Sequence, residues 1–393
     1  MDLRYSEEQD LIQQQARQFF ERECSLDTVR KAWASEAGLP EPLWKRMAEL
    51  GWLGALLPER LGGQELSVTA FSRIAEEMGR GLLPGGYLSH LLAALAIRLA
   101  GAPAQQQALL PPLARGETRV ALARCMEGGR FDPAGGRFYA DEKPDGYLLF
   151  GEKLAVPGLA QASEIVVSAV LGLPEPLSAG LVWFVVPRSL PGVVVKPLHT
   201  LEGGLKAASL RFDGVRIAAS ARLGAADRPA DGAGVLARVS QVAEVALAFD
   251  ALGGAARVTE LTVEYAKLRM AFGQPIGAYQ AVKHKCADMI FAVENLRAIA
   301  SWAAWVLDAP AGQTDASPAL ASAMARATAI ECYDLVIRHG TQAHGAIAVT
   351  EEHALPLYAK RSKTLALAFG GLAHYQEQIL KESGYRVPPV QRA

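Results

Sequence analysis

Two stretches in the last third of the chain carry residues that could do chemistry: YAKLRMAFGQPIGAYQAVKHKCADM at 265–289 and QAHGAIAVTEEHALPLYAKRSK at 342–363. The first contains Arg269 followed by the pair Phe272-Gly273, and the second contains a Gln-x-x-Gly turn from Gln342 to Gly345. An arginine can clamp a pyrophosphate with a planar fork of donors, and small turn residues let the backbone approach a flat ligand. The simpler interpretation of Arg269 is an arginine that interacts with the carbonyls at the end of its own helix.

Histidines in these stretches do not form a recognisable catalytic or metal set. His344 and His353 are nine residues apart, which is not the HExxH spacing of a zinc site. His284 has no carboxylate pattern around it that resembles a triad, so it is more simply a surface or packing residue.

Two carboxylates stand out because they lie on an apolar, helix-forming segment, VAEVALAFDALGGAARV at 242–258. Acids are rare on apolar helices, so Glu244 and Asp250 must each have a hydrogen-bond or charge partner, or a functional role. The simpler interpretation is that each faces solvent or pairs with an arginine, such as Arg257 seven residues after Asp250.

Composition indicates a folded, multi-domain protein. The 393 residues are half hydrophobic and 21% charged, and 40 basic side chains balance 41 acidic ones, which disfavours disorder and gives no basic field for nucleic acid. Cys24, Cys125, Cys286 and Cys332 form no CxxC pair, as expected of reduced thiols. The N-terminus is polar and no apolar run reaches 18 residues, so we expect a cytoplasmic protein without a membrane span.

The pattern of residues changes twice along the chain. Residues 6–118 show apolar positions at helical spacing, interrupted by glycine and proline. From 119 to 225 short β-branched runs alternate with turns, as in GYLLFG, EIVVSAV, GLVWFVVP, GVVVKPL and ASLRFDGVRI, which predicts an antiparallel sheet or barrel. Long helical patterns return after 226, for example at 235–269 and 281–308.

Both opening stretches resemble motifs of the acyl-CoA dehydrogenase family, R-x-x-F-G-x-P-I-x-x-[FY]-Q and Q-x-x-G-[GA]-x-[GA]-x-T. ELGWLGALLPERLGG at 49–63 and IAEEMGRGLLP at 74–84 continue the likeness, which covers nearly the whole chain. It implies an α+β multi-domain fold: an N-terminal helical domain at 1–118, a middle antiparallel β-barrel or sandwich domain at 119–225, and a C-terminal four-helix bundle at 226–393.

The resemblance also implies FAD bound between subunits of a tetramer. Arg269 would contact the flavin diphosphate, and the residues from Gln342 to Ala346 would pack along the adenosine. The cofactor-binding positions carried over from the family are Arg269, Phe272, Tyr279, Gln280, Gln342, Ala343, Gly345 and Ala346.

The implied reaction is α,β-dehydrogenation of an acyl-CoA thioester to a trans-2-enoyl-CoA. A carboxylate removes the α-proton while a hydride leaves the β-carbon for the flavin, and an electron-transfer flavoprotein then takes the electrons.

The usual catalytic base of the family is missing from its place. The matching residues are Ala368-Phe369-Gly370, and the alternative family position falls at Ala243, beside Glu244. In the branch that assembles from two different subunits and acts on steroid or other bulky acyl-CoA esters, a carboxylate sits in L-A-A-E-x-x-G. The match here is LAFDALG at 247–253, which makes Asp250 the predicted base.

The middle domain departs from the family as well. The usual flavin segment reads ARCME at 123–127, and Ala155 and Pro157 replace the usual aromatic and Ser/Thr residues beside the flavin ring. A chain altered in this way could complete a partner's flavin site while binding its own flavin poorly.

Three hypotheses remain open. The chain is an active dehydrogenase subunit with Asp250 as base, in a homo-oligomer or a heterotetramer. Alternatively, it is a non-catalytic subunit that completes the flavin site of a related partner. The third hypothesis is a relative that uses the flavin for nitroalkane or hydroxylation chemistry.

Overall fold

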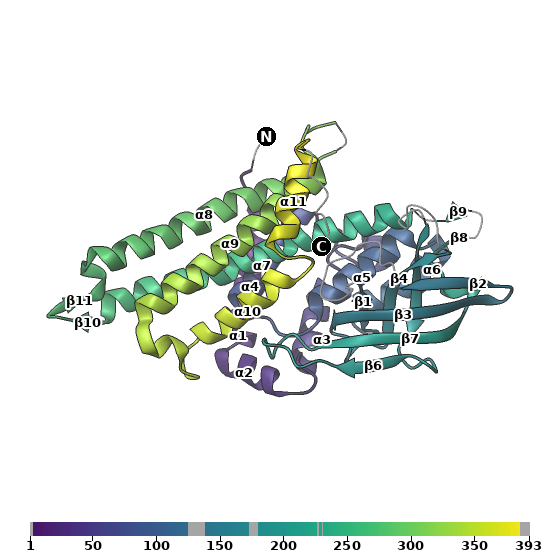
Figure 1. Cartoon of the computed structure of the whole chain (residues 1–393), viewed down its shortest axis with the longest axis horizontal. Helices are drawn as coiled ribbons and strands as arrows, with labels where there is room; N and C mark the ends of the chain where they lie inside the picture. Colours follow the sequence, from purple (N-terminus) through teal and green to yellow (C-terminus); the bar gives the residue numbers. More distant parts are fainter. Residues whose placement is uncertain are drawn as a thin grey trace, which may run out of the picture. The chain divides into compact units, whose positions relative to one another are not determined.

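The computed structural model describes residues 3–124, 138–172, 180–225, 228–229, 231–310 and 312–385, with helices at both ends of the chain and strands between them (Figure 1). The helices are α1 (Glu7–Glu23), α2 (Leu26–Ala34), α3 (Glu41–Glu49), α4 (Val68–Arg80), α5 (Tyr87–Ala100), α6 (Pro103–Ala114), α7 (Gly232–Leu268), α8 (Gln280–Asp308), α9 (Pro318–His344), α10 (Leu355–Leu367) and α11 (Leu372–Glu382). The strands are β1 (Val120–Ala123), β2 (Tyr139–Lys143), β3 (Gly146–Pro157), β4 (Glu164–Leu171), β5 (Leu181–Pro187), β6 (Val194–Pro197), β7 (Ala207–Ala218), β8 (Gly224–Ala225), β9 (Arg228–Pro229), β10 (Met270–Ala271) and β11 (Gln274–Pro275). The predicted succession of helical, β and helical regions is confirmed.

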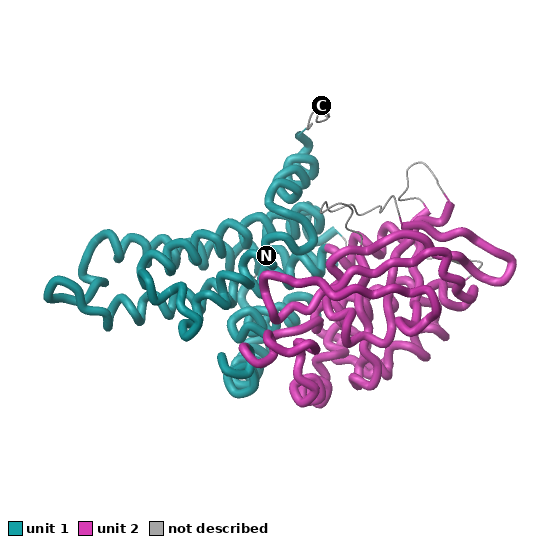
Figure 2. The backbone as a smooth tube through the Cα atoms, turned by 60° about the horizontal axis from the view of Figure 1, so that its bottom comes forward, with its two compact units in different colours: residues 1–29, 67–83, 241–393 teal, residues 30–66, 84–240 magenta. Residues whose placement is uncertain are grey.

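The chain forms two compact units that are interleaved in sequence (Figure 2). Unit 1 contains residues 1–29, 67–83 and 241–393, and unit 2 contains residues 30–66 and 84–240. Helix α4 therefore belongs to unit 1, whereas α5 and α6 belong to unit 2. The division into three domains with boundaries after 118 and 225 stays a prediction.

Polar caps explain where helices α1 and α9 of unit 1 begin. The Ser6 hydroxyl accepts a hydrogen bond from Gln9 N, and the Gln9 side chain accepts one from Ser6 N, so both exposed N–H groups at the start of α1 are satisfied. Helix α9 begins at Pro318, behind a Ser317 hydroxyl that accepts from Leu320 N. Helices α7 and α8 lie within a few residues of the predicted spans.

Helices α4 and α7 of unit 1 cross at two glycines. A Cβ atom at Gly79 would lie 1.8 Å from Asp250 O, and one at Gly253 would lie 1.7 Å from Glu76 O. No side chain fits at either position, so the two backbones are in direct contact. This crossing fixes the part of α7 that carries Asp250.

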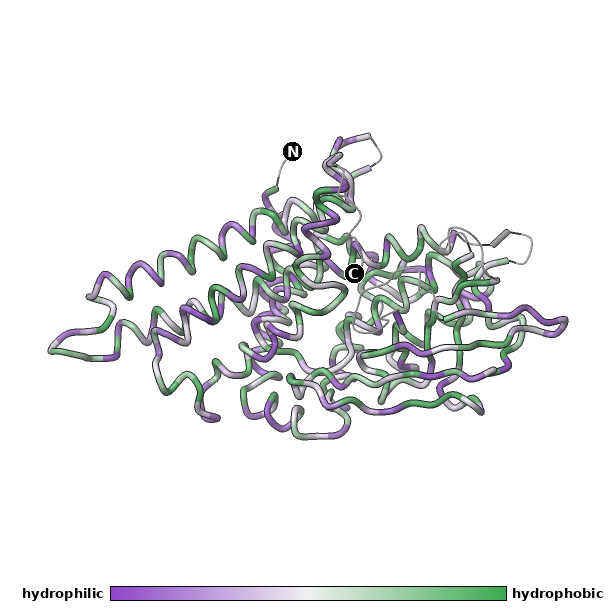
Figure 3. The backbone as a smooth tube through the Cα atoms, viewed as in Figure 1, coloured by the Kyte–Doolittle hydropathy of each residue, from purple (hydrophilic) through white to green (hydrophobic). Residues whose placement is uncertain are grey.

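Helix α8 carries charged side chains on one face as far as Arg297 and has none from Ala298 to Leu307. Figure 3 shows hydrophilic and hydrophobic residues alternating on it, and Arg297 donates to the buried carboxylate of Glu76 on α4 at 2.7 Å. Among the described residues α8 is the one helix long and apolar enough to cross a membrane, a test that core helices of folded proteins also pass. Its polar face and its ion pair are typical of a bundle helix.

Unit 2 is built on a seven-stranded sheet with the order β1-β4-β2-β3-β7-β6, and β5 pairs with β4. The predicted antiparallel pairing is found for β2–β3, β3–β7, β6–β7 and β4–β5. Strands β1 and β2 each pair with β4 in parallel, so the sheet is mixed. Both strands lie outside the predicted β-branched runs.

Helix α5 supplies hydrogen-bond acceptors to strand β1. The Ser89 hydroxyl accepts from Leu122 N at 3.0 Å, and His90 Nδ1 accepts from Val120 N at 3.3 Å. Burial lowers the pKa of His90 to about 4, so the imidazole stays neutral and keeps the lone pair that this contact needs.

The described cysteines are free thiols. Cys24 and Cys332 are buried, and burial raises the pKa of each to about 12. Cys286 is half-buried, and Cys125 lies outside the described residues. Thiols that are protonated and buried are poor nucleophiles.

Candidate active site

Helix α7 ends in a tight hairpin that presents an aromatic ring to solvent. Ala271 pairs with Gln274, which leaves Phe272 and Gly273 as the two turn residues. Their φ angles are +50° and +82°, the left-handed conformation that both central residues of a type I′ turn adopt. Phe272 is 97% exposed, although a non-glycine residue is strained in this conformation.

Arg269 has a fixed backbone and an uncommitted side chain. Its N–H donates to Tyr265 O and its carbonyl accepts from Ile276 N, each at 2.8 Å. The side chain is exposed and makes no hydrogen bond or ion pair in the described part of the chain. The alternative in which Arg269 caps its own helix through the guanidinium is therefore not what the structure shows.

Tyr279 and Gln280 stand at the start of α8. The Tyr279 hydroxyl donates to Ala271 O at 3.0 Å, which ties the helix start to the hairpin. Gln280 is the first helical residue, and its exposed side chain makes no hydrogen bond with described residues. Tyr279 thus supports the hairpin, whereas Gln280 is available to a ligand.

The second stretch forms the end of α9 and a short 3₁₀ turn, Gly345–Val349. Gly345 has φ +65°, and a Cβ atom built there would meet nothing within 4 Å. Gln342, Gly345 and Ala346 are exposed, and Ala343 is half-buried. A ligand can therefore approach the backbone of this turn closely.

A ring stack brings the two stretches together within unit 1. Tyr265 and His344 stack with their centroids 4.5 Å apart, and the His344 ring lies 4.8 Å from that of His353. His344 Nδ1 is 2.8 Å from Gly340 O. Because Tyr265 lies one helical turn before Arg269, the stack places the hairpin helix beside the end of α9. No three His, Cys, Asp or Glu side chains gather as metal ligands in the part of unit 1 or unit 2 that the structure describes.

The exposed residues of this region fit a flavin nucleotide. Arg269 offers charged donors to a diphosphate, Gln280 and Gln342 offer amide groups, and Phe272 offers an apolar ring face. None of the three polar side chains is engaged by described residues. They are therefore compatible with the contacts to FAD that the resemblance implies.

Asp250, the predicted base, lies in a buried ion pair. Its carboxylate oxygens accept from Arg361 of α10, at 3.2 Å from Nε and 2.5 Å from Nη2, and the two side chains are 3% and 8% exposed. Arg257, the partner suggested by the sequence, pairs with Glu260 instead. Both oxygens of this carboxylate are engaged by Arg361 in the folded chain, which makes Asp250 less available as a general base.

Neither Glu244, the other acid of the apolar segment 242–258, nor its neighbour Ala243 supplies an uncommitted base. Glu244 is buried, and its Oε2 accepts from the Ser322 hydroxyl at 2.6 Å. Ala243, at the alternative family position, is also buried. The catalytic role of Asp250 stays a prediction.

The connection between α10 and α11, where the resemblance places the usual base, is held rigidly around Phe369. The fully buried guanidinium of Arg326 donates through Nη2 to Leu365 O at 2.6 Å and Ala368 O at 3.1 Å. The Tyr375 hydroxyl donates to Phe369 O at 2.9 Å, and Phe369 has φ +62°. Buried side chains therefore hold the backbone of this connection in place, although residues 368–371 include no carboxylate.

The segment of unit 2 that the resemblance assigns to the flavin ring does not fit that role. Ala155 has φ +51° in a β-bulge between Lys153 and Val156, and Pro157 ends the strand. Alanine and proline have no hydroxyl or aromatic ring, and proline has no N–H to donate. Residues 125–127 of the other flavin segment lie outside the described residues.

Two of the buried arginines, Arg326 and Arg361, hold helices of unit 1 together and were not predicted from the sequence. Arg326 lies in the alanine-rich stretch SPALASAMARATA, and Arg361 lies in LPLYAKRSK. A cation on an apolar helix needs a partner as much as an acid does, so the reasoning applied to Asp250 could have singled out Arg326. Arg361 lies between Lys360 and Lys363, and no local pattern distinguishes it from them. The partners of the two arginines are carbonyls and a carboxylate on other helices.

Comparison with known proteins places the chain in a family. The acyl-CoA dehydrogenase N-terminal domain matches residues 6–117, and the acyl-CoA dehydrogenase C-terminal domain matches residues 230–383. Acyl-CoA dehydrogenase IpdE2 of Mycobacterium tuberculosis is 28% identical over 357 residues, which are 91% of this chain and 91% of that protein.

Solved structures agree with this placement. A variant of the Tcur3481-Tcur3483 steroid ACAD is 30% identical, with a TM-score of 0.82, over 96% of this chain and 98% of that one. The ChsE4-ChsE5 complex from Mycobacterium tuberculosis contains a chain that is 25% identical, with a TM-score of 0.85, over 99% of this chain and 100% of that one. With both domain models matched and the 30% identical structure covered almost completely, the chain belongs to the acyl-CoA dehydrogenase family, whose enzymes are FAD-dependent oxidoreductases that act on CH–CH groups.

Proposed function

We propose that the chain is one of two unlike subunits of a dehydrogenase that forms the trans-2 double bond in a bulky acyl-CoA and passes electrons to an electron-transfer flavoprotein. The observation that carries the proposal is the exposed set of Arg269, Phe272, Gln280 and Gln342 in unit 1. Because the polar members of the set have no partners in the described chain, they are available to a cofactor that a second chain also holds.

The relatives support a bulky substrate and a two-chain assembly. One similar structure is a steroid ACAD with two named components, and another is a complex of ChsE4 with ChsE5. A homo-oligomer is the alternative assembly. A cytoplasmic location is part of the same proposal, and cell fractionation would test it.

The chain's own residues would bind the cofactor and move the α-proton. Bound FAD supplies the acceptor for the hydride that leaves the β-carbon. Arg269 would hold the diphosphate by charge-assisted hydrogen bonds, and Phe272 would cover an apolar ring face. Asp250 would take the α-proton on the carboxylate oxygen that Arg361 releases.

The product assay tests the main proposal. The chain would be expressed with a related candidate partner and supplied with a steroid side-chain CoA ester and an electron-transfer flavoprotein. We expect trans-2-enoyl-CoA and reduction of the acceptor by the pair. Formation of a hydroxylated or nitroalkane-derived product, without the enoyl-CoA, would contradict it.

A second candidate function is that of a non-catalytic subunit that completes its partner's flavin site. The double hydrogen bond from Arg361 to Asp250 favours it, since this carboxylate is committed in the folded chain. The absence of a carboxylate at Phe369 favours it as well.

Two variants separate these functions. Asp250→Asn and Arg361→Met each break the buried pair, and each should cost stability of about 3 to 5 kcal/mol. If Asp250 is the base, substrate reduces the flavin far more slowly in Asp250→Asn than in Arg361→Met, because only the latter keeps the carboxylate. Equal rates in the two variants would assign the pair a structural role.

A further inference from the structure

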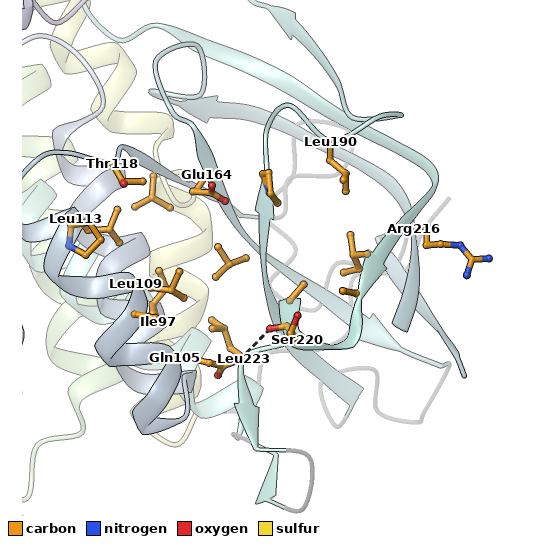
Figure 4. Close-up of a pocket in the computed structure, with 18 residues that line it drawn as sticks. Ile97, Gln105, Leu109, Leu113, Thr118, Glu164, Leu190, Arg216, Ser220 and Leu223 are labelled. Atoms are coloured by element: carbon orange, nitrogen blue, oxygen red, sulfur yellow. Dashed lines mark hydrogen bonds between the residues drawn. The ribbon is translucent and has the colours of Figure 1, made fainter. Parts of the chain in front are cut away.

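Unit 2 contains a cavity of about 630 Å³ between helices α5 and α6 and the sheet (Figure 4). A cavity of this size is in the range that holds small organic ligands. Its lining is mainly apolar and comes from both layers, with Ile97, Leu109 and Leu113 from the helices and Val185 and Leu223 from the opposite side. The cavity lies within one unit and uses none of the residues assigned above to the cofactor.

Strand β4 places a carboxylate on the wall of this cavity. Ile165, Val167 and Ala169 belong to the core on one face of the sheet. Because side chains alternate along a strand, Glu164 points to the opposite face, where it lines the cavity. Figure 4 shows its carboxylate beside the apolar side chains.

Two other polar residues on the wall are already engaged. The Gln105 side chain donates to Ser220 O and Arg222 O and accepts from Gly224 N. Arg216 donates to Asp145 at 2.7 and 2.8 Å, and its guanidinium points away from the cavity in Figure 4.

The carboxylate of Glu164, in contrast, has no hydrogen bond or ion pair with any described residue. The nearby cation Arg119, whose carbonyl accepts from Glu164 N, directs its guanidinium to Glu41 at 2.5 Å and over the Trp44 ring. Burial raises the pKa of Glu164, as expected for an acid against an apolar wall without a cation. A ligand with a positive charge would remove this cost.

We propose that this cavity binds a small apolar amine, with the hydrocarbon body against the apolar lining and the ammonium group paired with Glu164. An ammonium group supplies both the opposite charge and the donors that the carboxylate lacks. A carboxylate or phosphate ligand would instead meet like charge. The proposal is independent of the acyl-CoA chemistry and concerns a separate binding site in unit 2.

Calorimetric titration of the full chain tests the site with n-octylamine hydrochloride at neutral pH. We expect saturable one-to-one binding, with 1-octanol weaker by roughly tenfold or more, since a charged hydrogen bond is replaced by a neutral one. Octanoate should not bind. Equal affinity for octylamine and octanol, or no saturable binding of octylamine, would overturn the proposal.

Three variants locate the binding. Glu164→Gln keeps the size of the side chain and should weaken octylamine binding roughly tenfold or more. Glu152→Gln, at an exposed acid on β3, is the matched control and should leave the affinity unchanged. Leu109→Trp fills the cavity and should abolish binding of the amine while thermal unfolding remains cooperative. Unchanged binding in both Glu164→Gln and Leu109→Trp would show that octylamine binds elsewhere.

Discussion

Charged side chains in this fold divide into those that the chain satisfies itself and those that it leaves to a ligand. Asp250 is buried and paired at both oxygens, whereas Arg269 is exposed without a partner in the described residues. A buried pair contributes to one conformation, while an uncommitted cation at the surface costs little until an anion arrives. The first arrangement holds helices together in the ligand-free chain, and the second leaves a cation that a ligand can reach.

Arg269→Ala should weaken the retention of FAD in the assembled enzyme. Loss of a charge-assisted contact of about 1.5 to 3 kcal/mol corresponds to a roughly 10- to 150-fold higher dissociation constant. Flavin absorbance of the protein after dialysis measures the effect. Lys267→Ala, at an exposed cation two residues earlier, is the charge control, and an equal loss in both variants would leave only a general electrostatic effect.

His90 should make unit 2 less stable in acid. Its pKa is about 4 in the fold and about 6.5 in an unfolded chain, so the unfolded state alone takes up the proton as the pH falls between these values. The free energy of unfolding should fall by about 3 kcal/mol from pH 7 to pH 4 through this group. Urea unfolding of wild type and His90→Asn compares the slopes, because asparagine keeps an acceptor for Val120 N but does not titrate. Identical slopes would contradict the assignment.

For individual residues, the sequence predicts the positions of binding motifs better than it predicts which side chains form ion pairs. The exposed positions of Arg269 and Phe272 agree with a ligand-binding role that local spacing and the family pattern suggest. The partner of Asp250 is 111 residues away on another helix, and no local rule selects Arg361 over Arg257. Pairing across a bundle depends on helix packing, which single-residue reasoning cannot supply.

The crossing of α4 and α7 brings two backbones of unit 1 into direct contact. Gly79→Ala would place a Cβ atom 1.8 Å from Asp250 O, so the helices must separate. Because overpacking alone typically costs about 1 to 3 kcal/mol, we expect a loss of unfolding free energy at or above the upper end of that range. Denaturant unfolding measures it.

Gly371→Ala is the control for this crossing, because a Cβ atom there meets nothing within 4 Å. We expect its stability to stay within about 0.5 kcal/mol of wild type. If Gly79→Ala were as stable as Gly371→Ala, the two helices would not be in direct backbone contact.

Helices and strands could be predicted where a helical or β-branched pattern continued over several residues. Five β-branched runs became β3 to β7, and α7 and α8 agree with their predicted spans within a few residues. Strands β1 and β2 were missed because VALA is short and YADEK is largely charged. Their parallel pairing with β4 depends on contacts between distant segments.

At the scale of the molecule, the chain purified alone should carry well below one flavin per subunit. Ala155 and Pro157 provide few contacts for a flavin ring, and the residues that fit the cofactor lie exposed in unit 1. Visible absorbance with light scattering gives flavin content and mass in one run. Near-stoichiometric flavin in the isolated chain would instead favour a homo-oligomeric enzyme.

The order of helical and β regions could be predicted from sequence, but the composition of the two compact units could not. Helix α4 joins the C-terminal helices in unit 1 while α5 joins the sheet in unit 2, although the two are close in sequence. Such a division arises from long-range packing. The periodicity of a helix shows which of its faces is apolar but not which other element that face packs against.

The hairpin after α7 also affects how the newly made chain behaves in solution. Leu268, Met270 and Phe272 expose apolar side chains within five residues of one another, and exposed patches of this kind promote non-specific association. Until the cofactor and a partner subunit cover these side chains, the folded chain should therefore associate non-specifically with other proteins. Co-synthesis with a partner should raise its soluble yield even where its folding stability is unchanged.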